Sequence, residues 1–189
     1  MINIGLVGED PNDTTSIKNL LSKKYSKKVN FFPLANRIKG HQLDNPKIKK
    51  SLPIEFEDKE CKFIIYIRDL DGFKSEKDKY SKKFKWFSEL DACVNDEGVL
   101  LLNIWELEGL ILGDIDNFNK LYNTSAKFAG DCTMVKEPKE FLKKITAKSK
   151  KKFKESHCPD IFSHLDFDKI KKNCTSFKEF VAEFEQKIA

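Results

Sequence analysis

Apolar and polar residues alternate along this chain in blocks that predict strands and helices in turn. The expected strands cover residues 1–9, 28–35 and 61–69, and residues 98–114 are expected to begin as a fourth strand and to pass into a helix near Glu106. The other expected helices cover residues 11–25, 76–91, 138–155 and 176–188, and residues 40–56 are expected to form a loop or a short helix.

The segment CKFIIYIRD, from Cys61 to Asp69, has the clearest pattern in the chain. It is almost continuously apolar, which is typical of a strand that is buried on both faces. Strands that alternate with helices predict an α/β fold with a mostly parallel sheet flanked by helices. In such sheets ligands bind at the carboxyl ends of the strands, so chemically active residues are expected just after each strand.

Acidic residues occupy this position on three of the predicted strands. Glu9 follows the first strand, Asp69 and Asp71 end the central one, and Glu106 and Glu108 follow the next. Carboxylates brought within about 4–6 Å of one another repel and raise each other's pKa. A hard divalent cation with oxygen ligands, such as Mg²⁺ or Mn²⁺, relieves that repulsion. The sequence therefore predicts a metal site at the carboxyl edge of the sheet.

The motif DLDG, from Asp69 to Gly72, has two interpretations. In an extended strand Asp69 and Asp71 would face the same side, as two ligands of a metal site, and Leu70 would point into the core. The alternative is a turn, because Asp71-Gly72 is favourable turn sequence. A motif of this kind is weak evidence by itself, and the acidic residues after the other strands strengthen the metal-site interpretation.

Charge is unevenly distributed along the chain. Residues 1–135 carry equal numbers of basic and acidic side chains, so the formal net charge of +5 resides in residues 136–189. We expect residues 1–135 to form the α/β core and residues 136–189 to form a basic helical extension packed on the same domain. The basic extension suggests a polyanionic partner such as nucleic acid. The alternative for the lysine-rich block alone is a solvated helix face.

Three further features of the sequence bear on where in the cell the protein is expected. The chain contains no run of about 18 apolar residues, which predicts no membrane span. Its first residues, MINIGLVGED, lack the basic segment of a signal peptide. Five scattered cysteines without a CxxC pair predict reduced thiols in a cytoplasmic protein.

Four segments in this order resemble the Toprim domain, which topoisomerases, bacterial primases and the overcoming-lysogenization-defect nucleases share. They are VGEDPND, the motif DLDG, the segment WELEGLILGD and the terminal NCTSFKEFVAEFE. Small stand-alone members of this group are the most similar in layout. One departure is the second acidic residue of the first segment, which is either replaced by Asp13 or absent. Another is Arg68, directly before the motif DLDG, which would neutralise the cluster or contact a phosphate.

The resemblance implies a Toprim-like fold and a Mg²⁺-dependent nuclease that cleaves DNA or RNA. Asp69 and Asp71 would be metal ligands, Glu9 a ligand or a general acid or base, and Glu108 a further ligand in preference to Glu106. In a helix beginning near Glu106, the two glutamates would diverge by about 200° and could not both face the site.

A basic residue is also expected near the leaving oxygen. Lys154 is the first choice, with Lys152 and then His157 behind it. Surface lysine is the ordinary alternative for each of the two lysines.

The family likeness further suggests an antiphage-defence effector that works with a separate ATPase, because this chain has no Walker loop. Two other functions remain open from the sequence. One is a non-catalytic Toprim-like module that binds nucleic acid or protein. The other is a phosphatase or phosphotransferase, for which Asp69 would be the nucleophile. That enzyme would also need a Ser or Thr partner after a later strand, and no convincing one is present.

Overall fold

The computed structural model describes residues 1–35 and 45–189, so part of the segment expected as a loop or short helix, residues 40–44, lies outside the described residues. A parallel sheet with the order β2-β1-β3-β4 forms the centre of the molecule. Its strands are β1 (Ile2–Gly8), β2 (Val29–Pro33), β3 (Phe63–Asp69) and β4 (Val99–Asn103). The α/β class and the parallel sheet predicted from the sequence are thus confirmed.

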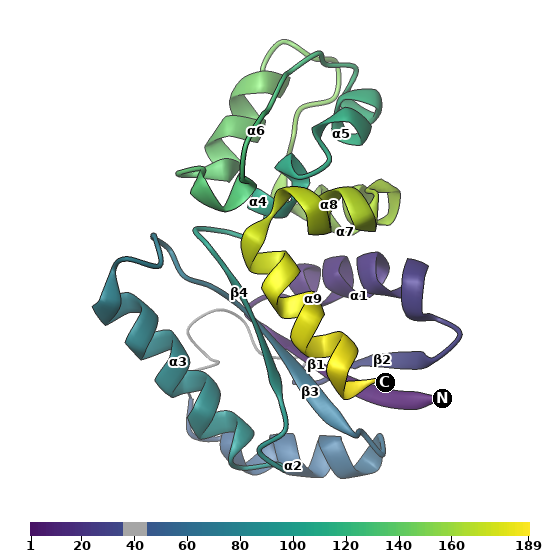
Figure 1. Ribbon diagram of the computed structural model, residues 1–189, viewed down its shortest axis with the longest axis vertical. Helices are drawn as coiled ribbons and strands as arrows, with labels where there is room; N and C mark the ends of the chain where they lie inside the picture. The colour runs from purple at the N-terminus through teal and green to yellow at the C-terminus, as the bar shows by residue number, and fades with distance from the viewer. Residues whose placement is uncertain (36–44) are drawn as a thin grey trace.

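Helices cover both faces of this sheet (Figure 1). Their bounds are α1 (Pro11–Tyr25), α2 (Ile48–Asp58), α3 (Lys77–Asp91), α4 (Gly109–Leu112), α5 (Ile115–Tyr122), α6 (Pro138–Thr146), α7 (Cys158–His164), α8 (Phe167–Asn173) and α9 (Thr175–Lys187), with short 3₁₀ turns η2 (Cys132–Met134) and η3 (Glu155–His157). In Figure 1, α5 and α6 form the upper part of the molecule, and α4, α7 and α8 lie between them and the sheet.

Strand β3 is buried on both faces, as its apolar sequence predicts. Phe63, Ile65 and Ile67 point into one hydrophobic cluster, together with residues of α1 and α9. Ile64 and Tyr66 point into the other, together with residues of α2 and α3. The alternation follows from the pleat of a strand, which sends successive side chains to opposite faces.

The helix expected over residues 138–155 is shorter than predicted. Helix α6 ends at Thr146, whose hydroxyl donates a hydrogen bond to Leu142 O and accepts one from Phe153 N. The chain therefore turns back, and Phe153 is buried beside the rings of Phe118 and Tyr122. Burial of this aromatic side chain outweighs the helical propensity of the lysine-rich segment.

The sequence pattern did not reveal α5, α7 or α8, each only seven or eight residues long. Helix α7 packs on α1, where Asn19 Nδ2 donates a hydrogen bond of 2.8 Å to Pro159 O. Helix α9 packs on β4, and Tyr25 OH at the end of α1 donates a hydrogen bond of 2.7 Å to Glu185 Oε1. The carboxyl-terminal segment thus completes one layer of the α/β core.

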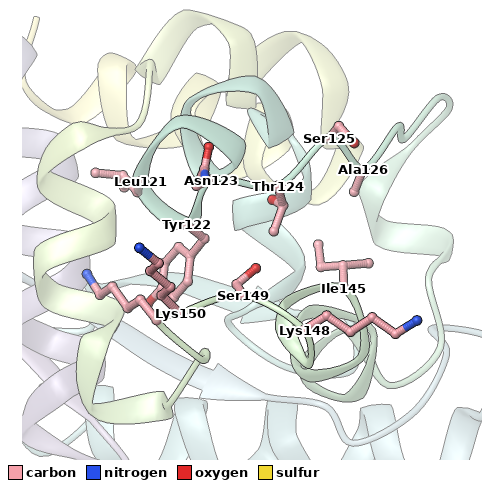
Figure 2. Close-up of a pocket in the computed structure, with 11 residues that line it drawn as sticks. Leu121, Tyr122, Asn123, Thr124, Ser125, Ala126, Ile145, Lys148, Ser149 and Lys150 are labelled. Carbon is pink, nitrogen blue, oxygen red and sulfur yellow. The ribbon is translucent and has the colours of Figure 1, made fainter.

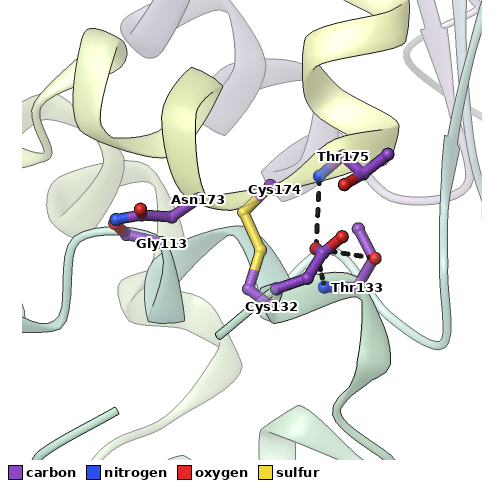
Figure 3. The surroundings of a disulfide bond; sticks show 7 residues. Gly113, Cys132, Thr133, Asn173, Cys174 and Thr175 are labelled. Carbon is purple, nitrogen blue, oxygen red and sulfur yellow. Dashed lines mark hydrogen bonds between the residues drawn. A yellow bond between two sulfur atoms is a disulfide. The ribbon is translucent and has the colours of Figure 1, made fainter. Parts of the chain in front are cut away.

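The prediction that all cysteines are reduced is wrong for one pair. Cys132 and Cys174 form a disulfide that joins η2 to the beginning of α9 (Figure 3). Asp131 Oδ1 accepts hydrogen bonds from Thr133 N at 2.9 Å and from Thr175 N at 3.2 Å, so one carboxylate holds the starts of both helices. The two cysteines are 42 residues apart, and only the return of α9 to the sheet brings them together.

Candidate metal site at the carboxyl edge of the sheet

The carboxyl ends of β1, β3 and β4 lie side by side and carry polar residues. Glu9 and Asp10 follow β1, and Asp10 caps α1 by accepting a 2.8 Å hydrogen bond from Asn12 N. Asp13 completes this cap, since its Oδ2 accepts a 3.2 Å hydrogen bond from Asp10 N. The ends of β3 and β4 are Asp69 and Asn103, which are partners in the sheet register.

Three carboxyl groups influence one another at this edge. Burial, followed by the charge of Asp13, raises the pKa of Asp69 well above its usual range. Burial and then the charge of Glu108 raise the pKa of Asp13 to about 7. Burial also raises the pKa of Glu108, which is only 5% exposed. These carboxyls come from α1, β3 and the residue before α4, so groups distant in sequence affect one another's pKa.

A second group of charges surrounds Glu9. Arg68 Nε lies 2.8 Å from Glu9 Oε1, and the Arg68 guanidinium lies 4.4 Å from the centre of the Trp86 ring. Lys83 Nζ lies 3.6 Å from Glu9 Oε1 and 3.1 Å from Asp71 Oδ2. Arg68 thus neutralises an acidic residue of the edge, which is one of the two roles expected for it. Glu9 and Asp71 are held together by the ammonium of Lys83.

The extended geometry predicted for the motif DLDG is wrong beyond Asp69. The strand ends there, and Asp71 has a left-handed φ of 56° and a 66% exposed side chain. Leu70 is fully buried, as expected. The turn alternative describes this segment, because Asp71 N donates a 3.0 Å hydrogen bond to Trp105 O, which pulls the backbone out of the strand direction. Asp69 and Asp71 therefore do not share one side of a strand.

Trp105, the partner of this turn, also has a left-handed φ, of 61°. Its backbone N–H donates a 3.2 Å hydrogen bond to Gly72 O, so the two segments exchange hydrogen bonds. A Cβ at Gly72 would lie 2.2 Å from Glu76 Oε1, so the flexible side chain of Glu76 would have to move if Gly72 were replaced. Left-handed backbone in a residue as bulky as Trp is uncommon and is concentrated at functional sites.

Lys139 is a charged residue of this edge that the sequence did not indicate. Its Nζ lies 3.5 Å from Glu106 Oε1 and 3.5 Å from Glu155 Oε2. Burial alone lowers the pKa of Lys139, but the charges of Glu108, Glu106 and Glu155 overcome this and raise it. No local pattern distinguishes this lysine from its many neighbours, since its position follows from the packing of α6.

The two glutamates after β4 have different surroundings. Both precede α4, which begins at Gly109, so they do not lie on a shared helix as the sequence had suggested. Glu106 Oε2 accepts a 3.2 Å hydrogen bond from Lys139 N, whereas Glu108 acts on the pKa of Asp13 and lies 3.9 Å from Cys158 Sγ. Glu108 is therefore the glutamate whose charge acts on Asp13 and Asp69.

The basic residues predicted in the tail lie elsewhere. Lys154 is exposed and precedes η3, and among the described residues it has no contact with Asp13, Asp69 or Glu108. Lys152 is exposed as well. His157 Nδ1 lies 2.8 Å from Tyr122 OH, and burial, then Lys151 and Lys154, lower its pKa. A role for Lys154 at the leaving oxygen stays a prediction.

Within the described part of the chain, no group of three or more His, Cys, Asp or Glu side chains is arranged closely enough to hold a metal ion. The kinds of donor nevertheless fit a hard cation, because Asp13, Asp69 and Glu108 offer only carboxylate oxygens. Asn103 Oδ1 adds a buried oxygen that has no hydrogen-bond partner. Among the same described residues, no helix has the length and apolar character needed to cross a membrane.

Comparisons with protein-family models, curated proteins and solved structures found no match to this chain.

Proposed function

We propose that this protein is a phosphodiesterase that uses Mg²⁺ or Mn²⁺ to hydrolyse nucleic acid. The single observation that carries the proposal is that Asp13, Asp69 and Glu108, from three segments at the carboxyl edge of a parallel sheet, are close enough for the charges of Asp13 and Glu108 to raise the pKa of Asp69. Grouping carboxyls that are buried or partly buried costs stability, so the arrangement is best explained by a positive ligand. The Toprim-like order of the sequence segments supports the same function.

Each charged residue has a role in this proposal. Asp69, Asp13 and Glu108 would hold the cation, and Glu9 and Asp71, which both contact Lys83, would be further candidate ligands. The cation would polarise the scissile phosphate and make a bound water more acidic. Arg68 and Lys83 hold Glu9 in place and offset the negative charge that a phosphate brings. Lys139, which forms ion pairs with Glu106 and Glu155 and feels the charge of Glu108, is the candidate we prefer for contact with the leaving oxygen.

The substrate panel that tests this consists of plasmid, single-stranded DNA and tRNA, each with Mg²⁺, Mn²⁺ or EDTA. Wild-type protein should cleave at least one of them with metal and none with EDTA. Asp69→Asn keeps the shape of the side chain and the oxygen that Asn103 contacts. Its loss of activity should exceed the roughly 10- to 100-fold typical of residues that only orient a ligand.

The matched control is Asp58→Asn, which makes the same chemical change at an exposed carboxylate at the end of α2. It should cleave like wild type. The proposal fails if wild type cuts nothing with either metal, or if Asp69→Asn cuts as well as Asp58→Asn. Comparable loss in both variants would point to a general charge effect and would also contradict it.

One observation favours a second function, that of a non-catalytic binding module. Glu9 and Asp71 are already paired with cations of the chain itself, Arg68 and Lys83. Such internal ion pairs could take the place of a metal ion, and the protein would then bind its partner without cleaving it. Retention of nucleic acid without cleavage under either metal supports the module. The phosphatase alternative would instead release phosphate from small phosphomonoesters. An antiphage role with a separate ATPase stays a prediction from the family resemblance.

A further inference from the structure

A surface pocket of about 600 Å³ lies between the end of α5 and the turn after α6 (Figure 2). Its lining consists of Leu121, Tyr122, Asn123, Thr124, Ser125, Ala126, Ile145, Lys148, Ser149, Lys150 and Lys151. None of these side chains is acidic. The lining thus combines three lysines and several neutral hydrogen-bonding groups with an apolar floor.

The lysines of this pocket are poorly compensated. Lys151 Nζ lies 3.7 Å from Asp160 Oδ2 and 4.8 Å from the centre of the Tyr122 ring. Lys148 and Lys150 are exposed, and no described acidic side chain lies within ion-pair distance of either. Elsewhere on the same segment Lys143 has the partners Glu140 and Glu155. Lys148 and Lys150 therefore bring to this pocket two positive charges without an acidic partner among the described residues.

The pocket wall is held in place before any ligand arrives. Asn123 ends α5 in a left-handed conformation, with φ 51° and ψ 51°, and turns the chain into residues 124–126. Asn119 fixes that segment, since its Nδ2 donates a 2.8 Å hydrogen bond to Ala126 O and its Oδ1 accepts from Thr124 Oγ1 at 2.6 Å. Such preorganisation lowers the entropic cost of binding.

The spread of the charges indicates an extended ligand. Figure 2 shows Lys148 and Lys150 at opposite ends of the pocket, with their ammonium groups directed away from each other. Charges spread in this way fit an extended anionic ligand better than a single phosphate. Helix α6 also connects the pocket to the carboxyl edge, because Lys139 lies in its first turn and Ile145 in its last. At a rise of about 1.5 Å per residue these positions are about 9 Å apart along the helix.

We propose that this pocket binds the backbone phosphates of a nucleic-acid strand that continues to the carboxyl edge. The choice of nucleic acid as the ligand rests on the function proposed above. The claim that the pocket binds an anion rests on the geometry and charge of the pocket. One strand of a duplex advances about 3.4 Å along the helix axis per phosphate, so a few nucleotides would span about 9 Å. Lysine ammonium groups bind backbone phosphates without reading the bases, so recognition here is independent of sequence.

The test compares two variants of equal charge. Lys148→Ala/Lys150→Ala removes the two ends of the pocket, and Lys27→Ala/Lys28→Ala removes two exposed lysines in the turn between α1 and β2. Binding of a labelled single-stranded oligonucleotide is measured by fluorescence anisotropy in EDTA over a series of salt concentrations. The pocket variant should bind roughly tenfold more weakly, with a salt slope reduced by about 1.4, as two lost phosphate contacts require.

Equal weakening in both variants, or no oligonucleotide binding by wild type, would overturn the proposal. Inorganic phosphate and a mononucleotide serve as competitors. If either displaces the oligonucleotide as well as an unlabelled oligonucleotide does, the pocket holds a single phosphate group and the extended-strand proposal is wrong. If the pocket variant binds the oligonucleotide more weakly but wild type shows no metal-dependent cleavage, this inference stands and only the proposed nuclease function is contradicted.

Discussion

Asn103 Nδ2 donates a hydrogen bond of 3.0 Å to Asp69 Oδ1, which joins the last residue of β4 to the last residue of β3. Asn103 is 2% exposed. Its amide lowers the pKa of Asp69, while burial and neighbouring acids raise it. Asn103 is thus a neutral donor that stabilises the charged form of Asp69, whose pKa is raised overall.

Loss of that donor should be costly. Asn103→Leu keeps most of the side-chain volume but leaves the Asp69 oxygen without its partner, and we expect a loss of about 1–3 kcal/mol in the free energy of unfolding. Urea unfolding measures it. Asn30→Leu removes a half-exposed amide whose Nδ2 lies 3.2 Å from Asn3 Oδ1, and should cost less than about 1 kcal/mol. Equal losses would mean that the Asp69 contact contributes nothing special.

A divalent cation should stabilise the folded protein. Mg²⁺ at about 100 times its dissociation constant would add about 2.7 kcal/mol, because it binds the folded site and not the unfolded chain. Each kcal/mol corresponds to about 2–4 °C in melting temperature for a chain of this size. Differential scanning fluorimetry with and without Mg²⁺ checks this, and an unchanged melting temperature at millimolar Mg²⁺ would count against the site.

Two variants of the same edge should respond in opposite directions without metal. Asp69→Asn should raise the metal-free melting temperature, because it removes a partly buried carboxyl that its neighbours repel, and it should weaken the response to Mg²⁺. Glu9→Gln should lower the metal-free melting temperature, since Arg68, which is 8% exposed, loses a charged partner at 2.8 Å. A loss of stability in Asp69→Asn would contradict the proposed repulsion.

The disulfide should contribute measurably to stability. Closing a loop between cysteines 42 residues apart is worth about 4 kcal/mol in the chain-entropy account. Reductant should therefore lower the free energy of unfolding of wild type and have no effect on Cys132→Ala/Cys174→Ala. Cys93→Ala changes a half-buried free thiol and should keep the response of wild type. Wild type that is insensitive to reductant would show that the bond contributes little.

The pair formed by Tyr25 and Glu185 should make stability depend on pH. Hydrogen bonds from Tyr25 and then Lys171 lower the pKa of Glu185. Tyr25→Phe should therefore cost about 1 kcal/mol at pH 7, a modest value because Glu185 is partly exposed.

The sign of that dependence follows from the lowered pKa. The stabilisation is fully present above the unfolded pKa of Glu, about 4.3, and is lost as the pH falls through the folded value. Urea unfolding at pH 7 and pH 3 should show the difference between wild type and Tyr25→Phe shrinking at the lower pH. A difference that grows on acidification would contradict this origin.

Local sequence patterns predicted those elements whose burial is regular. Strand β3 was recognised because all residues from Phe63 to Ile67 are apolar. Such a run is typical of a strand that is covered on both faces. The short helices α7 and α8 escaped notice because seven residues are too few to establish a helical period. Helix α6 was drawn too long because lysine favours helix locally, whereas the turn at Thr146 serves the distant burial of Phe153.

By itself, the sequence determined the α/β class, because apolar segments that alternate with helical ones can be read locally. It also determined that Glu9, Asp69 and Glu108 lie at or after the ends of strands, because the strands themselves could be recognised from those segments. Only the tertiary structure decided that Asp13 and Lys139 belong with those acids, that Asp71 turns outward, and that Cys132 meets Cys174. These outcomes depend on contacts between segments far apart in the chain. Their geometry is set by how the helices pack on the sheet, and the periodicity of a single segment carries no information about it.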